Sequence, residues 1–185
     1  MKHGQTLRRL HASDANPFRD ARLLGLQLHP ESFGSSYYEE AERPLDWFEA
    51  KLSDNIVIGA HTPSLELSGI IAVERMQSAK QRHKGVVWGV FIRPQFRGRG
   101  LGDMLMNMLF AQCKGVIEEL RLTVAETNEA ARRLYLKAGF SDYGFEKRSL
   151  KIDNHYVAEH HMMRQLLEPD VLVCPTSKKK GGIRN

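Results

Sequence analysis

Apolar and polar residues follow one another along this chain in a pattern that predicts alternating helices and strands. Leucines recur at helical spacing between Asn16-Pro17 and His29-Pro30, which predicts an amphipathic helix with Asn16 as its N-terminal cap. Similar spacing predicts further helices over 44–52, 101–113 and 128–138. Short runs rich in β-branched and aromatic residues predict strands over 6–11, 55–61, 67–77, 85–92, 119–124, 145–152 and 155–163.

The strand over 85–92 is nearly continuous in apolar residues, which is typical of a strand buried on both faces. No repeat or linker divides the chain, and 185 residues suit one domain better than two. The pattern therefore predicts a single α/β domain with a central mixed sheet over 1–167. The segment 168–185, which carries Lys178-Lys179-Lys180 and Arg184, is expected to be a basic, mobile C-terminal tail.

Composition and charge restrict the classes of function. No apolar run approaches the ~20 residues that cross a bilayer, and no hydrophobic segment follows Lys2, so we expect a cytoplasmic protein without a membrane partner. Cys113 and Cys174 are too few for a disulfide framework, and His160-His161 would point to opposite faces of a strand, so no metal is expected. The formal net charge of +5 favours an anionic partner, either nucleic acid or a phosphorylated small molecule.

A glycine-rich segment, Arg97-Gly98-Arg99-Gly100-Leu101-Gly102, joins the strand over 85–92 to the following helix. Its glycines allow positive φ and close approach of a ligand to the main chain, and the helix start offers free N–H groups. Together with the two arginines, these features indicate a phosphate cradle. The spacing matches neither the P-loop nor the dinucleotide fingerprint, and the glycines alone leave a plain strand-to-helix turn as an equal alternative.

Two segments of the sequence resemble the GNAT superfamily of N-acetyltransferases. Arg97–Gly102 resembles its Arg/Gln-x-x-Gly-x-Gly/Ala motif, and Asn128–Phe140 resembles its Asn-x-x-Ala-x-x-Leu-Tyr-x-Lys-x-Gly-Phe segment. Both occur in the family's order, with one predicted helix and one predicted strand between them. The resemblance implies a single-domain fold with a mixed, mostly antiparallel sheet flanked by helices. Its central strand pair would splay apart and leave a slot for acyl-CoA.

The resemblance also implies that acetyl-CoA binds as a co-substrate. Backbone N–H groups of the glycine turn would hold the pyrophosphate, and the end of the central strand would pair with the pantetheine amides. Asp103 departs from this picture, because it brings a negative charge near the pyrophosphate, and we expect Arg97 and Arg99 to offset it. The cofactor-binding residues implied by the resemblance are Val90, Phe91, Ile92, Arg97, Gly98, Arg99, Gly100, Leu101, Gly102 and Asn128.

Tyr135 is the catalytic residue that the resemblance implies, as proton donor to the departing CoA thiolate. Its alternative role is packing beside Leu134 and Phe140. No Cys lies in either motif, so direct attack by a primary amine in a ternary complex is favoured over an acyl-enzyme. The base stays open: some relatives carry a glutamate where this chain has Thr123, and the other carboxylates to consider are Glu74, Glu126 and Glu159.

The connection over 31–42 lies where this superfamily closes over its acceptor. Acceptor contacts are expected from Glu31, Phe33, Tyr37 and Tyr38, with a surface loop whose aromatics cover the core as the alternative. The acceptor would be the amine of a small molecule or a protein N-terminus or lysine, and the last hairpin would permit a homodimer. Two other classes stay open, a non-catalytic acyl-CoA-binding or regulatory module on the same fold and a basic nucleic-acid-binding domain.

Overall fold

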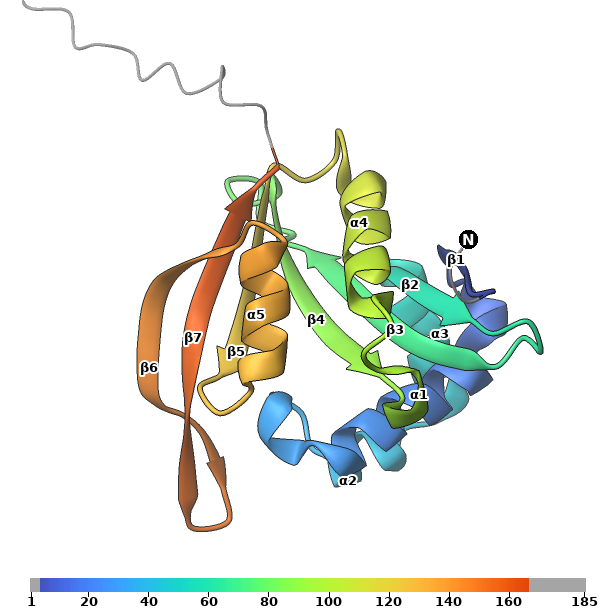
Figure 1. The fold of residues 1–185 in the computed structure, drawn as a ribbon, viewed down its shortest axis with the longest axis horizontal. Coiled ribbons are helices and arrows are strands. Elements are labelled where there is room, and N and C mark those ends of the chain that lie inside the picture. The colour runs from blue at the N-terminus through green and yellow to red at the C-terminus, as the bar shows by residue number, and fades with distance from the viewer. Residues whose placement is uncertain (1–3, 167–185) are drawn as a thin grey trace, which may run out of the picture.

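The computed structural model describes residues 4–166 and contains one seven-stranded sheet in the order β1-β2-β3-β4-β5-β7-β6 (Figure 1). Neighbouring strands are antiparallel, except that β4 and β5 are parallel. The mixed, mostly antiparallel sheet is therefore confirmed, whereas the predicted tail over 168–185 lies outside the described residues. The strands are β1 (Thr6–Arg9), β2 (Ile56–His61), β3 (Leu67–Arg75), β4 (Lys84–Ile92), β5 (Glu119–Ala125), β6 (Ser141–Ile152) and β7 (His155–Gln165).

Helices cover both faces of the sheet, and each face has its own apolar core. On one face, α4 (Leu101–Cys113) and α5 (Glu129–Lys137) pack on the sheet around Leu105, Leu109 and Leu120. On the other face, α1 (Ala15–Leu28) and α3 (Leu45–Asp54) bury Phe18 and Phe48. In Figure 1, α4 and α5 lie in front of the sheet and α1 and α3 lie behind it. The short helix α2 (Tyr37–Ala41) follows α1.

The parallel strands β4 and β5 separate in the middle of the sheet. They pair with each other only from Lys84 with Glu119 to Val86 with Arg121. Beyond these residues β4 continues to Ile92 and β5 to Ala125 without pairing with each other. The register between β3 and β4 shifts in the same part of β4, where Gly89 has a φ of +63°. A glycine at a bulge adopts this angle without strain and bends the strand. The splayed central pair that the sequence resemblance implied is thus present.

The expectation that β4 is buried on both faces is wrong. Its burial alternates: Val87 and Phe91 are buried, whereas Val86 is 39% exposed and Trp88 and Val90 are half-buried. Trp88 packs against the core on the α1 side and Val90 against the core on the α4 side, and both line a cavity beside β4. A continuous apolar run can therefore mark a strand that lines a binding cavity, and not only a strand covered on both faces by packed helices.

Two boundaries differ from the predicted ones because local hydrogen bonds compete with simple patterns. Helix α1 begins at Ala15, after a 3₁₀ turn over Ala12–Asp14, so Asn16 lies inside the first turn and is not the cap. Within the connection over 31–42, Ser36 and Glu39 form a reciprocal capping box that starts α2. This Ser-x-x-Glu signal is visible in the sequence, but the following helix is too short to show an apolar period.

Asp14 ties β1 to the start of α1. Arg8 donates two hydrogen bonds of 2.7 Å to its carboxylate, and these, helped by the His11 N–H, hold the pKa of Asp14 at about 2. A carboxyl whose pKa is lowered by folding stabilises the protein above its unfolded-state pKa of 3.8, and this stabilisation is lost as the pH falls toward 2. Because Arg8 is half exposed, solvent screens part of the effect.

The Asp14→Asn variant is therefore expected to lower the free energy of unfolding by about 1 kcal/mol at pH 7. The difference from the unmodified protein should shrink at pH 3, where the unfolded chain already binds the proton. Urea unfolding at the two pH values measures both quantities. Asp20→Asn, an exposed position on α1, is the matched control and should change neither value. A difference that does not change between pH 7 and pH 3 would contradict this explanation.

Candidate functional site

Two cavities meet where β4 and β5 separate. The first, here called the turn cavity, has a volume of about 410 Å³ and lies against the Arg97–Gly102 segment and the end of β4. The second, the strand cavity, has a volume of about 580 Å³ and lies between the middle parts of β4 and β5, with walls from α1 and α3 on one face of the sheet and from α5 on the other. Both volumes suit a small molecule. The residues that line both cavities are Ser32, Phe33, Val90, Asn128 and Ala131.

The turn cavity ends in a backbone cradle for an anion. Gly98 and Gly100 have φ values of +72° and +78°, and the space where a side chain would begin is open at both positions. The first hydrogen bond of α4 runs from the Met104 N–H to the Gly100 carbonyl at 3.2 Å. The N–H groups that precede it in the first turn have no carbonyl one turn earlier and carry the positive end of the helix dipole. Geometry and charge therefore both favour an anion here.

The two arginines of the turn differ in their surroundings. Arg97 lines the turn cavity, where its Nε donates to the Ile92 carbonyl at 2.9 Å and its Nη2 lies 2.8 Å from His29 Nε2. Arg99 is exposed and lies outside the lining of the turn cavity. The Arg97 side chain thus lines the turn cavity together with Gly98 and Gly100, whereas the Arg99 side chain does not.

Gly102 and Asp103 connect the turn to α5. A Cβ at residue 102 would lie 3.0 Å from Leu134, so the glycine allows close packing of the two helices. The Asp103 carboxylate lies 2.7 Å from Lys137 Nζ. The expectation that Arg97 and Arg99 offset this acid is therefore wrong, because Lys137 on α5 holds the carboxylate.

Asn128 stands at the boundary between the two cavities. It is the N-terminal cap of α5, and its side-chain oxygen accepts a hydrogen bond from the Ala131 N–H at 3.1 Å. Its amide nitrogen donates to Ser32 Oγ at 3.1 Å, which ties the connection after α1 to α5. An amide held on both sides presents a fixed polar group to whatever occupies the junction.

Tyr135 is buried and lines the strand cavity from the α5 side. Only 6% of its surface is exposed, and its ring packs edge-on against Phe140 at a centroid distance of 6.1 Å. Burial raises the pKa of the phenol above its ordinary value of 10, so the hydroxyl keeps its proton throughout the physiological range. Packing and proton donation, the two roles open from the sequence, are thus compatible in this position.

The predicted acceptor residues separate in the structure. Phe33 lines both cavities, and Glu31 lines the turn cavity, where its carboxylate lies 3.6 Å from His29 Nδ1. Tyr37 and Tyr38 lie on α2 outside the lining of either cavity, so the structure does not bring them together with Phe33 and Glu31. The capping box starts α2 at this point, where Tyr38 is 80% exposed and its ring packs edge-on against that of Tyr37.

A buried ion pair in the strand cavity was not predicted. Arg22 on α1 donates two hydrogen bonds, of 2.9 and 2.7 Å, to the Glu40 carboxylate, and both side chains are more than nine-tenths buried. The guanidinium also lies over the rings of Phe33 and Trp88, at 5.0 and 5.4 Å from their centroids. The sequence does carry a signal, because Arg22 interrupts the apolar stripe of α1 that contains its buried residues.

The carboxylates considered as bases have different positions. Glu74 and Glu159 line the strand cavity, Glu74 exposed and Glu159 buried, and Thr123 lines it as well. Glu126 is exposed and lies outside that lining. Cys113 is buried in α4 away from both cavities, and burial raises the pKa of its thiol to about 11, which suits an inert thiol. Cys174 lies outside the described residues.

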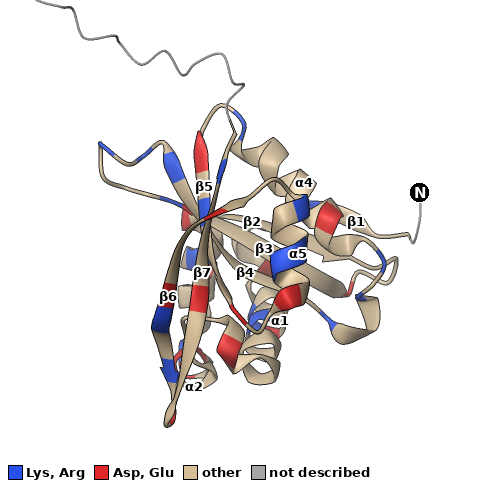
Figure 2. Cartoon of the chain, turned by 60° about the vertical axis from the view of Figure 1, so that its left-hand side comes forward, with Lys and Arg blue, Asp and Glu red and all other residues tan. Residues whose placement is uncertain are grey.

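Basic and acidic residues are both spread along the described part of the chain. In the ribbon of Figure 2, Lys and Arg positions and Asp and Glu positions occur on several of its strands and helices. Within residues 4–166, no group of three or more His, Cys, Asp or Glu side chains is placed to hold a metal ion. In the same part of the chain, no helix is long and apolar enough to span a bilayer.

Comparison with known proteins agrees with this architecture. Residues 24–140 match the acetyltransferase (GNAT) family model, and the chain therefore belongs to the GNAT acetyltransferase family. A GNAT acetyltransferase from Streptococcus pneumoniae is 24% identical, with a TM-score of 0.74 over 87% of this chain and 98% of that chain. These values show a shared fold.

Two further solved structures were determined with acetyl-CoA. The putative acetyltransferase yncA from Salmonella typhimurium has 19% identity and a TM-score of 0.73, over 89% of this chain and 95% of that one. A phosphinothricin acetyltransferase from Sinorhizobium meliloti has 17% identity and a TM-score of 0.74, over 94% of this chain and 97% of its own. Both share the fold of this chain.

Proposed function

We propose that this protein transfers an acetyl group from acetyl-CoA to a primary amine by direct attack in a ternary complex. The observation that carries the proposal is the meeting of the turn cavity and the strand cavity where β4 and β5 separate. One cavity ends in an anion cradle, as a CoA pyrophosphate requires, and the other is open for an acceptor. Membership of the GNAT family and the acetyl-CoA complexes of two structural neighbours support the assignment.

The residues of the turn cavity fit the donor. The open, positive-φ positions of Gly98 and Gly100 leave room for phosphate oxygens next to backbone N–H groups, and Arg97 adds a positive charge. The main chain of Val90–Ile92 has no partner strand on the β5 side and can pair with the pantetheine amides. The amide of Asn128 would contact the pantetheine arm at the junction of the two cavities.

In this reaction, the nitrogen of a neutral amine bonds to the acetyl carbon, the carbon–sulfur bond breaks, and the nitrogen gives up one proton to water. The departing thiolate takes a proton from Tyr135, which keeps one because burial raises its pKa, and the Tyr135 phenolate then regains a proton from water. Among the described residues, the only thiol is that of Cys113, which lies outside both cavity linings and whose pKa is raised to about 11 by burial, and this supports the acceptor amine itself as the nucleophile. We expect the enzyme to act in the cytoplasm, where acetyl-CoA is available.

The Gly100→Val variant tests the donor site. A valine at a φ of +78° is strained, and its branches would occupy the open space of the cradle, so we expect acetyl-CoA binding to weaken at least tenfold. Isothermal titration calorimetry with acetyl-CoA measures the change. Gly115→Val is the matched control, because Gly115 has a φ of +76° and equally open surroundings at the other end of α4. Equal weakening in both variants would point to a general loss of folding.

Catalysis is tested by following free CoA thiol in the presence of primary amines. Acetyl-CoA binding together with amine-dependent thiol release is the expected result. Binding without release for any amine would favour the non-catalytic acyl-CoA module. No binding of acetyl-CoA at millimolar concentration would overturn the proposed function.

A further inference from the structure

Glu159 on β7 is a buried carboxylate on the wall of the strand cavity. It is 6% exposed, and its Oε2 accepts a hydrogen bond from Ser149 Oγ at 2.5 Å. Within the described part of the chain it takes part in no ion pair, unlike Glu40, which is held by Arg22. A buried carboxylate without a counter-ion is unfavourable, so this position is suited to a cation brought by a ligand.

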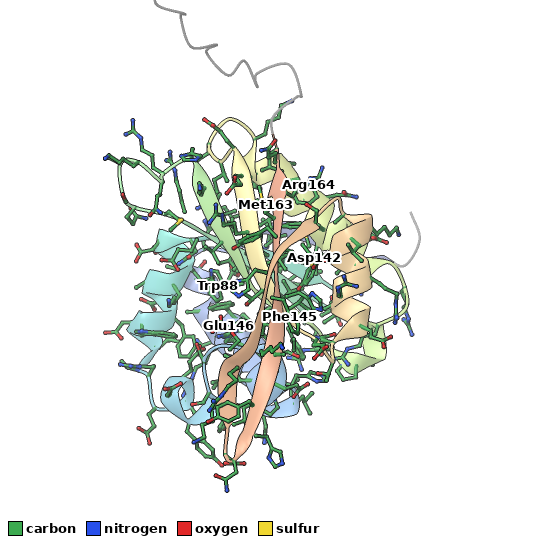
Figure 3. All side chains as sticks on the ribbon, turned by 90° about the vertical axis from the view of Figure 1, so that its left-hand side faces the viewer. Trp88, Asp142, Phe145, Glu146, Met163 and Arg164 are labelled. Atoms are coloured by element: carbon green, nitrogen blue, oxygen red, sulfur yellow. The ribbon has the colours of Figure 1, made fainter. Side chains whose placement is uncertain are left out.

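Two cations gather on another part of the same cavity, around Trp88 of β4. The Arg22 guanidinium carbon lies 5.4 Å from the centre of the indole ring, and Lys51 Nζ lies 5.5 Å from it. Figure 3 shows Trp88 on the side of the sheet that carries α3, to which Lys51 belongs. Among residues 4–166, Lys51 forms no ion pair. Of the two positive charges near the indole ring, that of Arg22 is therefore paired with the Glu40 carboxylate and that of Lys51 is not.

Arg22 keeps one hydrogen-bond donor free at this point. Nε and Nη2 are bound to Glu40, whereas Nη1 is buried and has no partner among the described residues. It lies 3.8 Å from the place where a Cβ of Gly89 would be, and no other non-neighbouring heavy atom lies within 4 Å of that place. The absent side chain of Gly89 therefore leaves an unfilled space beside an unsatisfied guanidinium donor, on the wall of the cavity.

From these contacts we infer that the acceptor is a small zwitterionic amine, with its ammonium toward Glu159 and a carboxylate or similar anion toward Lys51 and Arg22 Nη1. The inference rests on the proposed acetyltransferase function and names the substrate class of the same site. A ligand with one positive and one negative charge would pair with the Glu159 carboxylate through the first and with Lys51 and Arg22 Nη1 through the second. A diamine would place a second cation beside Lys51, and a simple monoamine would leave the free guanidinium donor unused.

The two other carboxylates of the cavity do not change this assignment, since Glu40 is already paired with Arg22. Glu74 is exposed, so water screens its charge, and its attraction for an ammonium is weak compared with that of the buried Glu159. The cavity volume of about 580 Å³ also suits a ligand of amino-acid size.

A substrate panel tests the inference through free-thiol release. The panel contains the standard amino acids, the corresponding amino-acid amides, the amines formed by removing their carboxyl group, and spermidine as a polyamine. We expect the best acceptor to be a free amino acid, with kcat/KM at least tenfold above that of its own amide and of its decarboxylated amine. A best acceptor that is an amide, a monoamine or spermidine would overturn the inference.

Two variants, measured with the best acceptor, test which side chains bind its ammonium and its anion, and a third variant is the control. Glu159→Gln should raise the KM for the amine at least tenfold and leave acetyl-CoA binding unchanged. Lys51→Met should reduce the preference for the acid over its amide toward unity. Glu146→Gln is the matched control, because Glu146 pairs with Glu159 in the hairpin, lies outside both cavity linings and should change neither value (Figure 3).

The possible results distinguish a wrong acceptor class from a wrong proposed function. Failure to bind acetyl-CoA would overturn the proposed acetyltransferase. Normal acetyl-CoA binding with no turnover of any amino acid, or with an amine KM that Glu159→Gln leaves unchanged, would overturn the zwitterion assignment alone. Folding of each variant is checked by its acetyl-CoA affinity, which requires an intact turn cavity.

Discussion

Replacing Tyr135 with phenylalanine is expected to lower kcat by roughly 10²–10³-fold while the affinity for acetyl-CoA stays the same. The ring of Tyr135 packs against Phe140 in the core, and phenylalanine keeps that contact. Only the hydroxyl is lost, and with it the proton for the departing thiolate, which is the size of effect expected for general acid catalysis. Steady-state thiol release and calorimetry with acetyl-CoA measure the two quantities separately.

The pH dependence provides a second readout for the same residue. A proton donor acts while protonated, and burial raises the pKa of Tyr135 above 10, so kcat should show no decline between pH 8 and pH 10 that depends on this residue. Tyr143→Phe is the control, because Tyr143 also lines the strand cavity but is 48% exposed and packs against His161. An equal loss of turnover and acetyl-CoA affinity in Tyr135→Phe would show that the residue acts through packing.

Most of the fold could be predicted from the sequence because its elements carry strong local signals. The helix over 101–113 is found with the predicted bounds, since its apolar residues keep helical spacing from Leu101 to Cys113. The helix that Asn128 caps and Gly139 follows was also predicted correctly. The separation of β4 from β5 came only through the family resemblance, because pairing partners and register are long-range properties that periodicity does not encode.

The donor half of the candidate site was easier to predict than the acceptor half. Glycines at a strand-to-helix turn indicate positions where the backbone needs a positive φ or where a ligand comes close to it. Gly98 and Gly100 indeed adopt positive φ. The strand cavity instead takes its charged side chains from α1, α2, α3, β3, β5 and β7, elements distant in sequence. Arg22 and Glu40 could have been noticed singly, but no sequence spacing shows that they meet.

The other large expected effect concerns the buried pair of Arg22 and Glu40. Arg22→Met should lower the free energy of unfolding by roughly 3–5 kcal/mol, because it leaves the buried carboxylate of Glu40 without a counter-ion. The double variant Arg22→Met/Glu40→Met removes both charges and replaces them with flexible apolar side chains of suitable length. It should recover most of the lost stability, since a buried pair is often no better than apolar residues of similar volume. Urea unfolding of the three proteins measures the coupling between the two sites.

If stability were the only role of this pair, the double variant would behave like the unmodified protein in every assay. The pair also ties α2 to α1 and holds the guanidinium between Phe33 and Trp88 at the cavity wall. We therefore expect the double variant to be folded and to bind acetyl-CoA, but to lose the preference for a zwitterionic acceptor over its amide. A single variant that unfolds with less than about 1 kcal/mol of lost stability would contradict the burial argument. A stable double variant that keeps the preference would instead place the anion at Lys51 alone.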